Sequence, residues 1–232
     1  MTTIIYKAGK LYADSRITQV ALKDGEWVPE SHSDTEVKIY EPRHLYMGGK
    51  RILAVGIAGL ARMKQLLEGL DEIAEKSDGF FNMDDADVPA AIQAHLPFKI
   101  SLVMVTTANV FVIEATKEEY KVSKFNLAHY LATGSGIDKT PQIIETVKKV
   151  SPEVAMVDAM LADSATGGEV SVWQYGRTGI KRYVPKRAYS KLDRYMTAWC
   201  HSIALVRDVT RMVISLAKYQ AEDQKNAKLV CQ

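Results

Sequence analysis

The 232-residue sequence contains only two cysteines, Cys200 and Cys231, and both lie in its last segment. This excludes a disulfide framework, and a reducing compartment, by default the cytoplasm, is expected. The first six residues, MTTIIY, have neither the basic start nor the apolar run of a signal peptide, and no apolar run is long enough to span a bilayer. We therefore expect a cytoplasmic protein without a membrane partner.

Patterns typical of metal and nucleotide sites are also missing. The five histidines are scattered without the spacing of metal ligands, and neither cysteine lies near the other. No glycine-rich loop of the phosphate-binding kind is present, so any ATP hydrolysis must come from another protein. The sequence therefore predicts no metal and no cofactor.

Net charge is small, only +2, but it is unevenly distributed. Residues 177–232 hold 12 Lys and Arg against 4 Asp and Glu, so the rest of the chain is acidic. From residue 186 onward, apolar residues alternate steps of four and three, which predicts a helix with a coiled-coil seam. Such a basic helix can bind an acidic partner or nucleic acid, but a solvated helix face explains it better. Nucleic acid is therefore not the expected partner.

What the sequence does contain is an ordinary globular composition, with 47% apolar and 25% charged residues. Short β-rich runs and helical spacings follow one another up to about residue 185. Strands are expected at 3–6, 10–14, 36–41, 51–56, 99–106, 109–114, 119–124, 127–133, 169–175 and 180–184, and helices at 58–76, 89–95, 140–150 and 152–162. This order describes an α+β protein with helices on the outer faces of antiparallel sheets.

The first two strands flank residues 7–9, which suit a three-residue hairpin loop with Gly9 in the left-handed conformation. Such a hairpin places Thr2 opposite Asp14. The polar stretch 23–35 is predicted to be a long loop.

Thr2 is the first candidate for chemistry. Removal of Met1, which is favoured when the second residue is small, leaves Thr2 with both a free α-amine and a hydroxyl. An α-amine titrates at about pH 8, so it can accept the hydroxyl proton while the oxygen attacks a carbonyl. If Met1 is retained, the amine is blocked and this chemistry is lost.

Six segments extend the pattern along the chain: residues 2–5, 13–18, 37–39, 58–60, 134–136 and 163–168, which read TTII, ADSRIT, VKI, AGL, GSG and DSATGG. In order and approximate spacing they resemble the proteasome β-subunits and the bacterial HslV peptidase. The resemblance implies an N-terminal nucleophile (Ntn) hydrolase. Its fold would be a four-layer αββα sandwich over residues 2–185, followed by the basic helical extension 186–232.

The resemblance also implies a catalytic set, namely Thr2, Asp14, Lys38, Ser135, Asp163 and Thr166. In it Thr2 is the nucleophile and its amine the base, Lys38 lowers their pKa values by its charge, and Asp14 holds Lys38. The other three would complete the hydrogen-bond network around the amine. Without the resemblance, Lys38 and Asp14 are explained as surface charges, and the others as turn or helix-end residues.

Substrate contacts follow from the same resemblance. Gly59 matches a glycine whose backbone N–H is an oxyanion donor, although a closely packed structural glycine is the alternative. The implied substrate-binding residues are Ile17, Thr18, Tyr40, Ile57 and Ala61. Of these, Thr18 would pair with an extended peptide by strand addition, and the rest would line a pocket for an apolar or medium-sized side chain.

The expected function is therefore a threonine peptidase or amidase acting on peptides or unfolded proteins. It would work in a homo-oligomeric ring, and an AAA+ unfoldase is considered as a partner. A catalytically inactive structural or assembly subunit is the alternative. The chain departs from the family in the shorter spacing between Thr2 and Asp14, in Met63, and in the basic extension; these bear on partners and assembly more than on chemistry.

Overall fold

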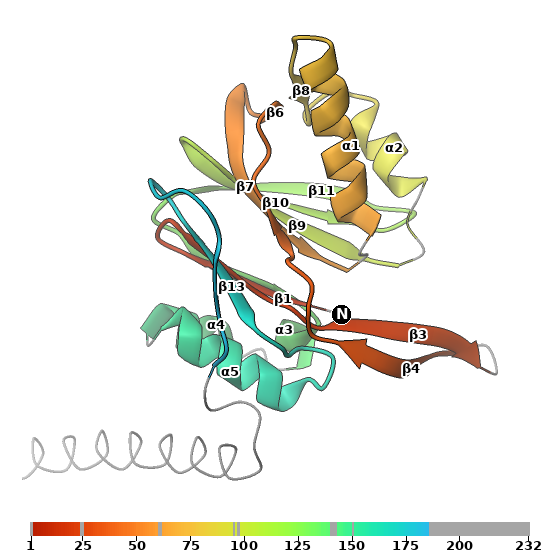
Figure 1. Cartoon of the computed structure of the whole chain (residues 1–232), viewed down its shortest axis with the longest axis vertical. Helices are drawn as coiled ribbons and strands as arrows, with labels where there is room; N and C mark the ends of the chain where they lie inside the picture. The colour runs from red at the N-terminus through yellow and green to blue at the C-terminus, as the bar shows by residue number, and fades with distance from the viewer. Residues whose placement is uncertain are drawn as a thin grey trace, which may run out of the picture. The chain divides into compact units, whose positions relative to one another are not determined.

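Two β-sheets lie face to face, and each carries helices on its outer side (Figure 1). The computed structural model describes residues 2–185 except 24–25, 60–61, 95, 97, 140–142 and 150. The predicted helical extension, residues 186–232, lies outside the described residues. Its coiled-coil seam and the domain boundary before it therefore stay predictions.

The first sheet contains the beginning and the end of the described chain. Its strands are β1 (Thr3–Lys7), β2 (Lys10–Asp14), β12 (Tyr130–Gly134), β13 (Val170–Gln174) and β14 (Lys181–Tyr183). They pair in the order β12-β1-β2-β13-β14, all antiparallel. The expected left-handed Gly9 is confirmed, but Ala8 also has positive φ and Lys7 pairs with Lys10. The loop therefore has two residues rather than three, and the register brings Thr3, not Thr2, opposite Asp14.

The second sheet contains an antiparallel meander, residues 100–126, and ends in one parallel pair of short strands. Its strands are β5 (Ile39–Tyr40), β6 (Leu45–Met47), β7 (Lys50–Ala58), β8 (Phe81–Asn82), β9 (Ile100–Thr106), β10 (Asn109–Ala115) and β11 (Tyr120–Asn126). Their order is β11-β10-β9-β7-β6-β8, and β5 also pairs with β7. Every residue of β9 is buried, which explains its unbroken run of small and apolar side chains.

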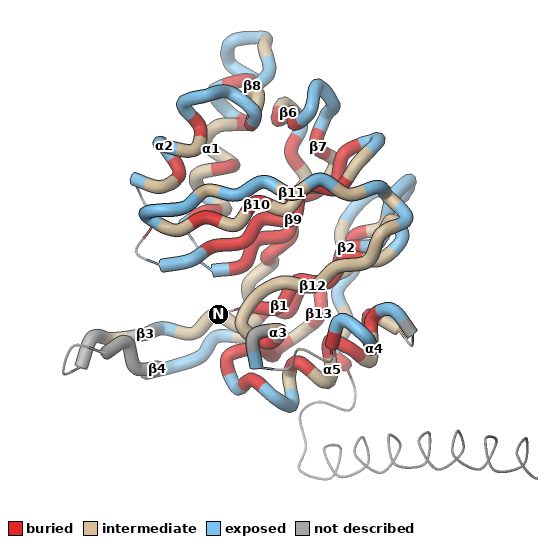
Figure 2. Tube along the Cα trace, turned by 180° about the vertical axis from the view of Figure 1, so that it is seen from behind, coloured by how far each residue is buried: buried red, intermediate tan, exposed pale blue. Residues whose placement is uncertain are grey.

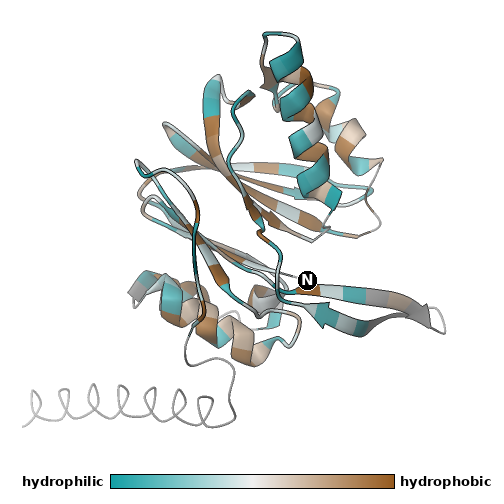
Figure 3. Ribbon diagram, in the orientation of Figure 1, coloured by the Kyte–Doolittle hydropathy of each residue, from teal (hydrophilic) through white to brown (hydrophobic). Residues whose placement is uncertain are grey.

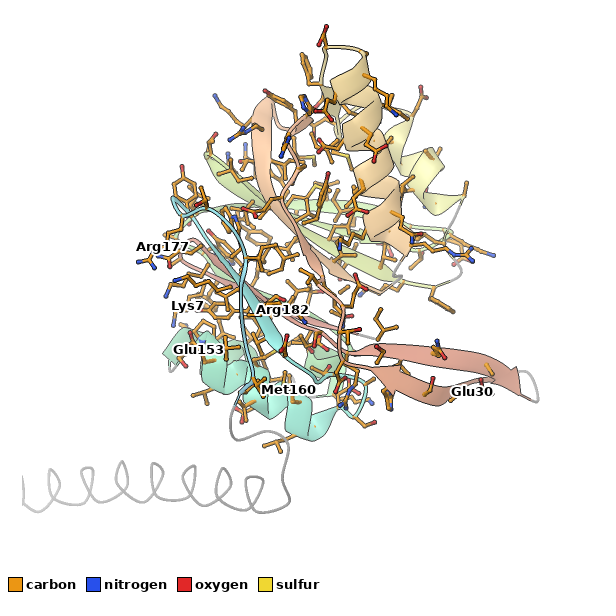
Figure 4. The ribbon with its side chains drawn as sticks, viewed as in Figure 1. Lys7, Glu30, Glu153, Met160, Arg177 and Arg182 are labelled. Carbon is orange, nitrogen blue, oxygen red and sulfur yellow. The ribbon has the colours of Figure 1, made fainter. Side chains whose placement is uncertain are left out.

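Helices cover both outer faces. They are α1 (Arg62–Lys76) and α2 (Val88–Gln93) on the second sheet, and α3 (Ser135–Lys139), α4 (Ile143–Lys149) and α5 (Pro152–Ala162) on the first. The predicted start of α5 is confirmed, because Ser151 Oγ accepts from the Val154 N–H and Pro152 occupies the first turn. Lys7 of β1, labelled in Figure 4, donates to the Val147 carbonyl at the end of α4. None of the described helices is long and apolar enough to cross a membrane.

Buried apolar side chains form three clusters, one in each space between neighbouring layers. Ile4 packs between the sheets with Val103, whereas Ile5 packs on the helical side with Met156. This alternation follows from the strand, whose successive side chains point to opposite faces. The third cluster, which includes Leu67, lies between α1, α2 and the second sheet. Figure 2 shows buried residues along the strands of both sheets and on the helices, and Figure 3 shows hydrophobic residues alternating with hydrophilic ones along these elements. The predicted four-layer αββα fold is confirmed for the described residues.

The prediction of a long loop at 23–35 is wrong. β3 (Ile17–Lys23) and β4 (Glu26–Ser33) form a separate two-stranded antiparallel sheet that extends away from both large sheets (Figure 1). Exposed ribbons bury neither face in a core, so their sequence carries no clear alternation of apolar and polar residues. In the sequence, the dipeptide Asp24-Gly25 between the strands is typical of a hairpin. The polar composition of residues 23–35 predicted a loop instead.

Several predicted boundaries also move. The strand expected at 36–41 shortens to β5, and β6 was not expected. The helix expected from residue 58 begins at Arg62, because Ala58 still belongs to β7. The helix expected at 140–150 corresponds to α4, and the shorter α3 precedes it.

Candidate active site

The start of β1 lies between two buried carboxylate clusters. Thr2 is only 4% exposed, and its carbonyl accepts from the Ser135 N–H at 3.0 Å, which joins β1 to the start of α3. The next residue, Thr3, donates its N–H to Asp14 Oδ1 at 2.9 Å. Its Oγ1 lies 2.9 Å from Thr166 Oγ1. Thr3 therefore links the two clusters through one backbone and one side-chain hydrogen bond.

The first cluster is a buried ion pair. Lys38 Nζ donates to Asp14 Oδ1 at 3.1 Å and to the Arg16 carbonyl. Asp14 Oδ2 accepts from the N–H groups of Gly167 at 3.0 Å and Arg16 at 3.2 Å. Burial raises the pKa of Asp14 above its ordinary value and lowers the pKa of Lys38 below its own, although each charge partly opposes the other shift. The arrangement places a lysine with a lowered pKa beside the start of β1.

The second cluster is centred on Asp163, whose side chain is fully buried. Its Oδ2 accepts from Ser135 Oγ at 2.7 Å and Thr166 Oγ1 at 3.0 Å. Its Oδ1 accepts from Lys139 Nζ at 2.7 Å and the Ala165 N–H at 3.2 Å. Burial raises the pKa of Asp163, but these four donors outweigh it and hold the pKa below its ordinary value. The site therefore contains an ionised carboxylate surrounded by donors.

Arg16 fixes the loops around the first cluster. Its guanidinium forms two 2.8 Å hydrogen bonds to Asp34 and one of 2.9 Å to the Ser164 carbonyl. The hydrogen bonds from Arg16 lower the pKa of Asp34. Because the carbonyl of Arg16 is also an acceptor for Lys38, these contacts hold that acceptor in place.

Gly59 follows the end of β7, where φ is +112° and an added Cβ would lie 2.8 Å from the Lys99 carbonyl. Only glycine fits this conformation and this contact. Its use as an oxyanion donor stays a prediction. Nearby, the Ile57 N–H donates to the Lys38 carbonyl at 2.9 Å, and Tyr40 packs on the same apolar cluster as Ile57. The structure therefore brings these two predicted substrate residues together.

Two other predicted substrate residues, Ile17 and Thr18, do not belong to that cluster. Ile17 and Thr18 begin β3, and Thr18 Oγ1 lies 3.1 Å from His32 Nδ1 of β4. Ala61 lies outside the described residues.

Three residues of the site were not found from the sequence: Thr3, Arg16 and Lys139. Thr3 and Arg16 stand inside matching segments, but nothing in those segments assigns them contacts. Lys139 follows Ser135 by four residues, a helical spacing that places both on one face once α3 is known. Among the described residues, no group of three or more His, Cys, Asp or Glu side chains is arranged to hold a metal ion.

The two sheets and their outer helices form a proteasome-like αββα fold. The solved structures that the chain resembles include Anbu (ancestral beta-subunit) from Yersinia bercovieri, with a TM-score of 0.55, 12% identity, and coverage of 90% of this chain and 96% of that one. An Anbu mutant (Gly-1) from Hyphomicrobium sp. strain MC1 has a TM-score of 0.51 and 14% identity, and the match covers 91% of this chain and 99% of that one. The Anbu complex from Pseudomonas aeruginosa, described as a helical assembly, has a TM-score of 0.51 and 13% identity, and the match covers 88% of this chain and 95% of that one.

No protein-family model and no curated protein sequence matches the chain. The structural comparisons correct the family prediction, because they indicate similarity to Anbu rather than to HslV or the proteasome β-subunits. The short sequence segments did not separate these proteins. At 12 to 14% identity the likeness shows the fold alone.

Proposed function

We propose that the chain is a proteasome-like threonine hydrolase in which Thr2, freed from Met1, is the nucleophile. The observation that supports this most strongly is the buried pair of Lys38 and Asp14 at the start of β1. Burying two charges is costly, and an apolar pair of similar volume serves folding as well or better. A lysine kept there at this cost is typical of a functional site.

Lys38 would act through its positive charge and through the one N–H donor that Asp14 and Arg16 do not use. An ammonium has three N–H donors, and two of them are used by Asp14 Oδ1 and the Arg16 carbonyl. In the proposal the third is directed at the Thr2 hydroxyl, where the positive charge favours the developing alkoxide.

The reaction would then proceed as an acyl transfer. The Thr2 amine accepts the proton of the Thr2 hydroxyl as Oγ1 attacks the substrate carbonyl, and the Gly59 N–H stabilises the oxyanion. The ammonium returns that proton to the leaving amine when the peptide bond breaks. Water, deprotonated by the same amine, hydrolyses the resulting ester and releases the acid.

The second cluster would orient the amine. Ser135 and Thr166 each use their single hydroxyl proton on Asp163, so their oxygen lone pairs are the groups left to accept N–H from the amine. This directs the nitrogen lone pair of Thr2 away from the cluster. The role proposed for the cluster is therefore orientation of the base.

Peptides or unfolded proteins are the proposed substrates, since the start of β3 offers backbone groups for strand addition at Thr18. The cytoplasm stays the expected setting. We also propose that copies of the chain assemble, which the helical assembly described for the P. aeruginosa Anbu supports. Whether the assembly is a ring or a helix, and whether an AAA+ unfoldase takes part, is decided by electron microscopy of the purified particle.

Labelling of Thr2 tests the proposal. Intact mass of the natively expressed protein should show loss of Met1. A peptide epoxyketone, which reacts with both an N-terminal amine and its hydroxyl, should then add once per chain at Thr2.

Matched variants make this test specific. Thr2→Ser keeps amine and hydroxyl and should still be labelled, whereas Thr2→Ala keeps only the amine and should not. Protein that retains Met1, or that begins at Thr2 and stays unlabelled while folded, would leave the inactive structural subunit as the better reading.

A further inference from the structure

The hydroxyl protons around Asp163 can be placed from the hydrogen-bond directions. Ser135 and Thr166 both donate to Asp163 Oδ2, and a hydroxyl has only one proton to donate. Thr166 must therefore accept, and Thr3 donate, in the 2.9 Å contact between their Oγ1 atoms. With Lys139 and a backbone N–H donating to Oδ1, every contact favours the ionised form of Asp163.

Lys139 supplies a positive charge next to this buried carboxylate. Its Nζ lies 2.7 Å from Asp163 Oδ1, but its own side chain is 47% exposed while that of Asp163 is fully buried. Lys139 ends α3, the helix that begins with Ser135. Replacing a half-exposed lysine opens no cavity in the core, so its charge can be removed without disturbing the packing.

We propose that Lys139 is a positioning residue whose charge offsets the field of Asp163 at the Thr2 amine and so keeps that amine uncharged near neutral pH. The inference rests on the proposed function, in which the amine must accept a proton. A buried carboxylate beside an amine favours the ammonium form, and an ammonium cannot act as a base. With Lys139 beside it, Asp163 stays ionised and still accepts from its hydroxyl donors. The charge of Lys139 offsets most of the effect of Asp163 on the protonation of the amine.

Two further ion pairs lie around the first cluster, Asp14 with Lys38 and Arg16 with Asp34. Lys64 of α1 lies 3.6 Å from Glu36 and 3.9 Å from Glu68, so that group carries one net negative charge with or without Lys139. Loss of Lys139 removes the salt bridge that offsets the charge of Asp163 itself.

The test is a titration of the Thr2 amine that does not require activity. The full chain is produced with Thr2 as its first residue by cleavage of an N-terminal fusion. Threonine is labelled with carbon-13, and the Thr2 Cα and Cβ shifts are followed by NMR from pH 5 to 10. Lys139→Met should move the amine titration to higher pH by about one pH unit. Lys139→Arg should restore it, and Lys121→Met, which removes an exposed lysine from β11, should leave it unchanged.

The same variants are compared in the pH profile of epoxyketone labelling, whose acid limb should shift by the same amount at constant plateau rate. An amine titration that is equal in wild type and Lys139→Met would overturn the inference and make Lys139 an ordinary surface ion pair. If the titration shifts but no variant is labelled, the inference stands and the proposed hydrolase function fails. If the wild type is labelled without any shift, only the inference fails.

Discussion

At the scale of single residues, Asp163 couples the candidate site to stability. Its pKa is held below the ordinary value because its hydrogen-bond donors outweigh the effect of burial. A carboxylate whose pKa is lower in the folded state than in the unfolded state stabilises the fold. This stabilisation is present above the unfolded-state pKa, about 3.9, and is lost as the pH falls through the folded-state pKa. Asp163 should therefore stabilise the fold at neutral pH but not in strong acid.

The first prediction is that Asp163→Asn lowers the free energy of unfolding by about 2 kcal/mol at pH 7, since charge-assisted hydrogen bonds are lost. The difference from wild type should persist at pH 5 and shrink towards pH 3, where the wild type loses the contribution of its carboxylate. Urea unfolding at the three pH values measures this. The control is Glu118→Gln, which removes an exposed carboxylate. If the difference between Asp163→Asn and wild type did not change with pH, the lowered pKa of Asp163 would not contribute to stability.

The second prediction concerns the buried ion pair. Lys38→Met leaves the Asp14 carboxylate buried without its cation and should cost about 3 kcal/mol, and Asp14→Asn should cost a similar amount. The double variant should cost at least about 1 kcal/mol less than the sum, because its second change removes an already unpaired group. Urea unfolding of the wild type, the two single variants and the double variant measures the coupling between the two residues.

The same variants separate stability from chemistry. Lys38→Met should slow epoxyketone labelling of Thr2 by about 100-fold or more, within the range typical of a lost proton-transfer or charge contribution. Additive unfolding energies would show that the two residues are not coupled. Unchanged labelling of folded Lys38→Met would remove Lys38 from the proposed mechanism.

The site could be predicted from sequence only as far as residues that stand in matching segments. Asp14, Lys38 and Asp163 were placed in one site, and the structure does bring them to the start of β1. The contacts of Thr3 with Thr166 and of Lys139 with Asp163 could not be predicted, because these partners lie 163 and 24 residues apart in sequence. Their roles, like those of the predicted set, are matters for the experiments above.

At the scale of elements, the β3–β4 hairpin stands apart from the rest of the fold. Its strands pair only with each other, with a register shift between Gln19 and Val20, while every other described strand belongs to a larger sheet. Two-stranded sheets without further support are only marginally stable in water. Contacts at its base, such as the one between Thr18 and His32, are exposed.

The third prediction is that amides of β3 and β4 exchange with deuterium much faster than those of β1 and β2, because little free energy is needed to open the hairpin locally. Hydrogen exchange with mass-spectrometric readout measures this on the free subunit. The β1–β2 hairpin is the matched control, since it has a tight turn but lies inside a five-stranded sheet. Equal protection of the two hairpins would show that the outer one is covered by a partner.

Elements with a strong local sequence signal were predicted best. The buried β9 and the capped start of α5 carry strong local signals, apolar runs in one and Ser151-Pro152 in the other. The sequence of the β3–β4 ribbon has no such signal apart from the dipeptide Asp24-Gly25. Short strands such as β5 form because β7 is beside them, and that neighbour is a feature of the tertiary fold rather than of the local sequence.

At the scale of the whole molecule, the three apolar clusters are each completed by side chains from the described part of residues 2–185. Both sheets have their inner and outer faces covered within that part. The described part of the αββα core therefore supplies the side chains of its own apolar clusters.

The fourth prediction is that deleting residues 187–232 leaves the core folded but reduces the size of the assembly. The coiled-coil pattern of the deleted segment favours contacts with the body or with another copy, and its basic charge complements the acidic remainder of the chain. Far-ultraviolet circular dichroism and urea unfolding report on the core, while light scattering reports the mass. A variant that replaces alternate lysines of the segment by glutamine tests whether charge or the apolar seam drives assembly. Unchanged mass together with lost DNA binding would instead assign the segment to nucleic acid.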